Sequence, residues 1–191
     1  KPLPNVNAGN NVQLCKGDSV TLQGSGANSY TWHPTDRLSD HLIPNPISSP
    51  VNTMIYHLIG EGSNGCTNHD SVIVTVEVVN TSNAIGPNLV IKNDTVLYHI
   101  PNPNPSSNYQ WHSADAVFSA LSSNMDSFFV SWQESGVQSV HFFEISANGC
   151  MGDTMSLRVD VLGIDTIYGT VFVQPGVPAI QGNVKLFEIL R

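Results

Sequence analysis

The sequence is poor in charge, and above all in positive charge. Only 12% of its 191 residues are charged, and 7 Lys and Arg stand against 15 Asp and Glu, a formal net charge of −8. Nucleic acid and anionic membrane surfaces repel such a chain, and no cluster of basic residues offsets the average. We therefore expect neither as a partner.

Long apolar runs are also missing. No stretch approaches the roughly 20 apolar residues that a membrane-spanning helix needs, so we expect no membrane insertion. The chain starts at Lys1 and shows no signal peptide. We take it for an excised fragment, in which a missing targeting signal says nothing about where the parent protein goes.

Motifs for catalysis and metal binding are scarce. The three cysteines have no CxxC spacing, the seven histidines show no HxH or HExxH spacing, and neither a GxSxG nor a phosphate-binding loop occurs. An odd number of cysteines means that at least one is unpaired or pairs outside the chain. The sequence predicts a non-enzymatic protein without catalytic residues, cofactor or metal site.

What is abundant is Gly, Pro, Asn, Ser and Thr, a composition that favours strands and turns over helices. Apolar residues recur with period two, as Val20 and Leu22 do, and longer alternating runs predict further strands. Two proline-rich segments are expected to be loops or edge segments. The predicted strands are 55–59, 71–79, 137–146 and 156–161, and the predicted loops are 43–46 and 100–105.

Landmarks in the first half of the chain return in the same order in the second half. Each copy ends in an Asn-Gly pair that favours a tight hairpin turn, followed by an alternating strand. The matched segments are 15–20 with 91–96, 30–33 with 109–112, and 64–66 with 148–150. The repeat predicts two β-sandwich modules, 1–79 and 84–162, joined in line by a short linker. Residues 164–191 are expected to be the truncated start of a third β-module.

One tryptophan in each repeat stands where a sandwich places its core aromatic, on the third strand. Trp32 and Trp111 are therefore predicted core residues, with sugar stacking by exposed rings as the alternative. His33 and His112 follow them directly, so they should point outward as solvated surface residues.

On these landmarks the chain resembles the PKD-like and immunoglobulin-like repeats of very large bacterial surface and secreted proteins. The motifs of the first copy are Asn7–Asn10, Cys15–Val20, Trp32 with Pro34, Leu38–Asp40 and Asn64–Cys66; those of the second are Trp111, Trp132 and Asn148–Asp153. The chain lacks the Trp-Asp-Phe-Gly-Asp-Gly type of turn that is usual in the PKD motif. The strands at 168–171 and 184–187 are similar to the start of prealbumin-like modules of the carboxypeptidase regulatory or collagen-adhesin B type.

This resemblance implies a non-catalytic, extracellular module of a multidomain protein, often one exported by the type IX route. It also implies a disulfide between Cys15 and Cys66, which an oxidising compartment permits; two buried free thiols are the alternative. Asp36, Asp40, Asp115 and Asp126 leave calcium binding open as an alternative, although no dense cluster of acidic residues occurs.

Asp followed by Ser or Thr and an aliphatic residue or Met occurs five times. Such an Asp closes a turn through nearby backbone groups, and the strand then begins one residue later. The motif also resembles a bacterial O-glycosylation sequence, which would make five residues acceptors. These are Ser19, Ser71, Thr95, Thr154 and Thr166.

Together these observations predict a spacer or adhesion module that contacts neighbouring domains of its own polypeptide, or surface glycans or proteins. The rival interpretation is a carbohydrate-binding accessory module of an extracellular polysaccharide-degrading enzyme. A glycan binder should show an exposed row of aromatics or a polar groove, whereas a spacer should bury its tryptophans.

Overall fold

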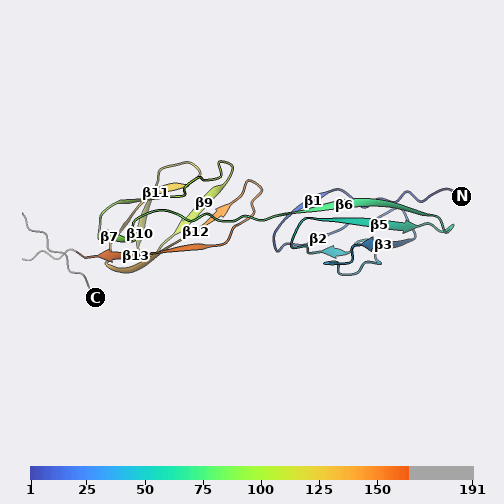
Figure 1. Cartoon of the computed structure of the whole chain (residues 1–191), viewed down its shortest axis with the longest axis horizontal. Coiled ribbons are helices and arrows are strands. Elements are labelled where there is room, and N and C mark those ends of the chain that lie inside the picture. The colour runs from blue at the N-terminus through green and yellow to red at the C-terminus, as the bar shows by residue number, and fades with distance from the viewer. Residues whose placement is uncertain (164–191) are drawn as a thin grey trace, which may run out of the picture. The chain divides into compact units, whose positions relative to one another are not determined.

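The computed structural model describes residues 1–163, and these are all β, without a helix (Figure 1). The chain divides into two compact units, Lys1–Val79 (unit 1) and Asn80–Arg191 (unit 2). The all-β prediction is thus confirmed. The predicted third module, 164–191, lies outside the described residues.

Unit 1 has a four-stranded sheet in the order β1-β6-β5-β3, and β2 and β4 pair in a second layer. Backbone bonds of 2.9 Å from Leu22 N to Pro46 O and from Gly24 N to Pro44 O continue that pairing. Its strands are β1 (Val12–Cys15), β2 (Val20–Thr21), β3 (Ser29–His33), β4 (Ile47–Ser48), β5 (Met54–Glu61) and β6 (Thr67–Glu77).

The core of unit 1 follows from the two-residue period of its strands. Along β5, Tyr56 and Leu58 are fully buried, whereas Ile55, His57 and Ile59 between them are exposed. One face of the sheet therefore packs against the second layer and the other faces outward. The buried cluster is Val6, Ala8, Leu22, Trp32, Tyr56, Leu58, Val72 and Val74.

Unit 2 has a four-stranded sheet in the order β7-β13-β12-β9 and a three-stranded sheet in the order β10-β11-β8. Its strands are β7 (Leu89–Ile91), β8 (Val96–His99), β9 (Asn108–His112), β10 (Ala116–Ala120), β11 (Ser127–Trp132), β12 (Gly136–Ile145) and β13 (Met155–Leu162). The main buried cluster is Val90, Tyr98, Phe128, Val130, Trp132, Val140, Val159 and Val161. A second cluster is Ala84, Ile100, Tyr109 and Phe142.

The larger sheets of the two units have the same connectivity. In each, the first strand runs parallel to the last (β1 with β6, β7 with β13), and the last two strands form a hairpin. Gly65 and Gly149 adopt φ of 75° and 84° in these hairpins, a conformation that favours glycine, which explains the Asn-Gly pairs. The predicted strands agree with β5, β6, β12 and β13 to within a few residues, and both proline-rich segments are loops.

Candidate functional site

Trp32 lies in the middle of the core of unit 1. Its side chain is 0% exposed, and its Nε1–H donates to the carbonyl oxygen of Ile43 at 3.1 Å. Burial of the ring together with a partner for its N–H is the arrangement of a structural tryptophan. The ring offers no exposed face on which a sugar could stack.

Trp111 occupies the matching place on β9, and its Nε1–H donates to Met125 O at 2.7 Å. Its ring is half-buried and stacks on Phe142, with 4.4 Å between ring centroids. The fully buried tryptophan of unit 2 is instead Trp132 on β11, whose N–H donates to the hydroxyl of Ser113 at 3.2 Å. Trp132 continues the alternating run of buried residues Phe128 and Val130 along β11. This two-residue period is the sequence signal that could have identified it as a core residue.

The predicted Cys15–Cys66 disulfide is wrong. Cys66 is a free cysteine. Cys15 ends β1 opposite Glu77, the last residue of β6, whereas Cys66 stands just before Thr67, the first. The 11 residues of β6 separate the two positions by roughly 35 Å, and a disulfide needs Cα atoms within about 7 Å.

The Asp-Ser/Thr motifs are exposed where they are described. Ser19, Thr95 and Thr154 each directly precede a strand, as the turn interpretation predicts, and all three are exposed. Ser71 differs because it lies inside β6, although its side chain is also exposed. Thr166 lies beyond the described residues.

The aspartate of the second motif has a structural role. A carboxylate oxygen of Asp70 accepts the backbone N–H of Ala8 at 2.8 Å, and this bond lowers the pKa of Asp70. The carboxylate thereby attaches the N-terminal segment to β6.

The aspartates considered for calcium do not converge. Asp40 accepts the backbone N–H of Leu42 at 2.9 Å, and Asp126 accepts the hydroxyls of Ser122 and Ser127 at 2.7 and 2.9 Å. The bond from Ser122 is the main cause that lowers the pKa of Asp126. Between residues 1 and 163, no group of three or more His, Cys, Asp or Glu is placed to hold a metal ion.

The histidines after the tryptophans do point outward. His33 on β3 lies directly opposite His57 on β5, and His112 on β9 lies directly opposite His141 on β12. Sequence spacing missed both pairs because the partners are 24 and 29 residues apart (57 − 33 and 141 − 112) and meet only through strand register.

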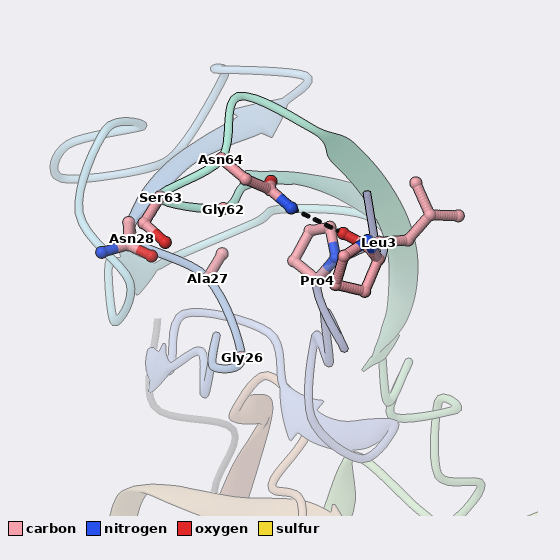
Figure 2. Close-up of a pocket in the computed structure, with 9 residues that line it drawn as sticks. Leu3, Pro4, Gly26, Ala27, Asn28, Gly62, Ser63 and Asn64 are labelled. Atoms are coloured by element: carbon pink, nitrogen blue, oxygen red, sulfur yellow. Dashed lines mark hydrogen bonds between the residues drawn. The ribbon is translucent and has the colours of Figure 1, made fainter.

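A groove in unit 1 has a volume of about 340 Å³ (Figure 2). Three segments line it: the N-terminal residues 2–4, the turn at 26–28 and the hairpin loop at 62–64. The Asn64 amide spans one side and donates to Pro2 O at 2.9 Å. The lining offers amides, a hydroxyl and backbone groups but no ionisable side chain, so it can donate and accept hydrogen bonds without acid–base chemistry.

The described part of the chain has no helix that is long and apolar enough to span a membrane. In each unit a larger sheet packs one face on a second sheet, and a tryptophan lies on the third strand of the unit in chain order. The two units are immunoglobulin-like β-sandwiches.

No family model matches the chain, and neither does any curated protein. Solved structures that resemble it include murine CEACAM1b, at 13% identity over 78% of this chain and 96% of that chain, with a TM-score of 0.36. The fibronectin(III)-like modules of Clostridium thermocellum CbhA give 11% identity over 85% and 95%, with a TM-score of 0.40. The human Desmocollin-1 ectodomain gives 12% over 82% of this chain and 36% of that chain, with a TM-score of 0.34. Likeness at this level says nothing about function.

Proposed function

We propose that the chain is a non-catalytic spacer and adhesion module of the PKD-like kind. It belongs to a larger secreted or cell-surface bacterial protein that is exported by the type IX route. Its proposed partners are the neighbouring domains of the same polypeptide. The observation that carries the proposal is that the chain enters and leaves each unit at opposite ends.

In unit 1 the N-terminal residues are bound to the β5–β6 hairpin. Asn64 Nδ2 donates to Pro2 O at 2.9 Å, and Asn68 Nδ2 donates to Pro4 O at 3.0 Å. From that end β6 runs for 11 residues, roughly 35 Å, before the chain leaves at the other end. The unit therefore spans the distance between its two attachment points along the length of a strand.

Unit 2 has the same arrangement. The backbone N–H of Glu144 donates to the hydroxyl of Thr81 at 3.3 Å, which holds the incoming chain near the β12–β13 hairpin. The last strand, β13, then runs away from that hairpin for 8 residues, roughly 26 Å.

This geometry suits a module that carries tension. β1 runs parallel to β6 with the register Val12–Val74 to Cys15–Glu77. Pulling on the two ends of unit 1 draws the strands past each other, so their hydrogen bonds are loaded together rather than one by one. Such loading raises the force needed to open the unit.

Stretching the full chain by its ends in a single-molecule force instrument, in reducing buffer that opens the disulfide of Cys15, tests the proposal. Lys16 N donates to Glu77 O at 2.9 Å, so by alternation the N–H of Leu14 faces β6 and that of Gln13 faces away. We expect Leu14→Pro to lower the force of one of two unfolding events and Gln13→Pro to leave it unchanged. Equal forces for both variants and the native chain contradict the load-bearing role.

The rival, a carbohydrate-binding module, gains no support from the tryptophans, because Trp32 and Trp132 are fully buried and Trp111 packs against the core. A glycan array with the full chain separates the two functions. Specific retention by one polysaccharide favours the rival.

We also propose O-glycosylation at the exposed Ser19, Ser71, Thr95 and Thr154, and at Thr166. Exposed hydroxyls are accessible to a modifying enzyme. Intact mass of the protein from its native host should exceed the sequence mass by whole glycan units. An unmodified mass contradicts the idea.

A further inference from the structure

A row of two histidines and a serine crosses the outer face of unit 1. His33 on β3 lies opposite His57 on β5, and His57 lies opposite Ser71 on β6. The inward-facing neighbours Trp32 and Leu58 are 0% exposed, so the two imidazoles point outward, and both are exposed.

The same row crosses unit 2. His112 on β9 lies opposite His141 on β12, and His141 lies opposite Ser156 on β13. Here Nδ1 of His141 and Oγ of Ser156 are 2.6 Å apart. That contact fixes the ring and leaves Nε2 of His141 for another ligand, as groups behind metal-binding histidines do.

Strand geometry brings each pair of imidazoles side by side. Trp32 N donates to His41 O at 2.8 Å and Tyr109 N donates to Asn124 O at 2.9 Å, both away from the neighbouring strand. By alternation His33 and His112 face their partner strand, so each histidine pair exchanges backbone bonds. The Cα atoms of such a pair are about 5.5 Å apart. Two imidazoles at this spacing can reach one ion.

We propose that each row binds one divalent cation of the zinc class through its two imidazoles, with water in the remaining positions. Neutral imidazole suits zinc, copper and nickel, and a site with fewer than four protein ligands keeps open positions for water or a partner's group. The net charge of −8 favours cations. The positive charge of Arg158 on β13 is paired with the carboxylate of Asp160 at 2.9 Å. The site does not depend on the spacer function.

The test is a titration of the full, tag-free chain with zinc chloride, followed by NMR of the histidine ring signals. We expect the signals of His33 and His57 to move together, and those of His112 and His141 likewise. His69 is the internal control, because it is exposed on the same face of unit 1 but lies opposite Ile59. Calcium chloride, a hard cation that prefers oxygen ligands, should move none of them.

Variants then separate the two sites. His57→Gln should lower zinc affinity in unit 1 at least about tenfold and leave unit 2 unchanged, and His141→Gln should do the reverse. The matched control His69→Gln should change neither. The proposal is overturned if the paired rings stay unmoved at about 1 mM zinc, the weakest affinity of interest, or if His69→Gln weakens binding as much as His57→Gln. Because the wild-type titration needs no variant, poor folding of a variant does not remove the test.

Discussion

Replacing Trp32 with alanine should strongly destabilise unit 1 and leave the stability of unit 2 unchanged. The indole is 0% exposed and belongs to the buried cluster of unit 1 only. Truncating a buried tryptophan costs about 3–5 kcal/mol, and the lost bond to Ile43 O adds about 1 kcal/mol. A domain of 79 residues has a total stability of roughly 4–12 kcal/mol. The substitution therefore removes a large part of it.

Amide hydrogen exchange measured by mass spectrometry resolves the two units. Protected amides within 1–79 should exchange about 10³- to 10⁴-fold faster in Trp32→Ala, since each factor of ten corresponds to about 1.4 kcal/mol. Protection within 80–163 should stay as in the native chain. Trp132→Ala is the matched control, because Trp132 is also 0% exposed but belongs to the cluster of unit 2, and it should give the reverse pattern. Equal loss of protection in both halves for either variant refutes the reasoning, because it requires one merged core.

Three further substitutions test single contacts. Burial raises the pKa of Tyr98 from 10 to about 12. As the pH rises, the phenol therefore loses its proton in the unfolded state first. The stability that the neutral phenol contributes below pH 10 is lost as the pH rises toward 12. Chemical denaturation should show this loss in the native chain and not in Tyr98→Phe, which also leaves Pro87 O without its bond. The hydroxyl of Ser107 is buried and has no partner, so Ser107→Ala should be neutral or stabilising by up to about 1 kcal/mol in the same assay; a loss above that contradicts the assignment. Since Cys66 is a free cysteine, Cys66→Ser should change the free energy of unfolding by no more than about 0.5 kcal/mol, and a loss of several kcal/mol in non-reducing buffer would restore the predicted disulfide.

The period of the strands and the chemistry of the turns were readable from the sequence. Apolar residues predicted the strands β5 and β6. The Asn-Gly pairs predicted the hairpins, where Gly65 and Gly149 adopt positive φ. These are local signals, because neighbouring residues alone determine them. The Cys15–Cys66 pairing failed because it depends on which end of a strand each residue occupies, and the parallel pairing of β1 with β6 is a long-range property.

The candidate metal sites show where sequence reasoning stops in this fold. A search for HxH spacing finds ligands on one strand, whose side chains at i and i+2 share a face. Here the partners come from two strands, so their meeting depends on register. A shift of β5 by one residue places Leu58 rather than His57 opposite His33, on the outer face, and turns His57 toward the core. Burial of Trp32 opposite Leu58 fixes the register in unit 1. In unit 2 the half-buried Trp111 packs against the core and lies opposite the buried Phe142. The core tryptophan therefore fixes the position of the histidine that follows it, which is why one Trp-His dipeptide in each unit yields the same outward pair.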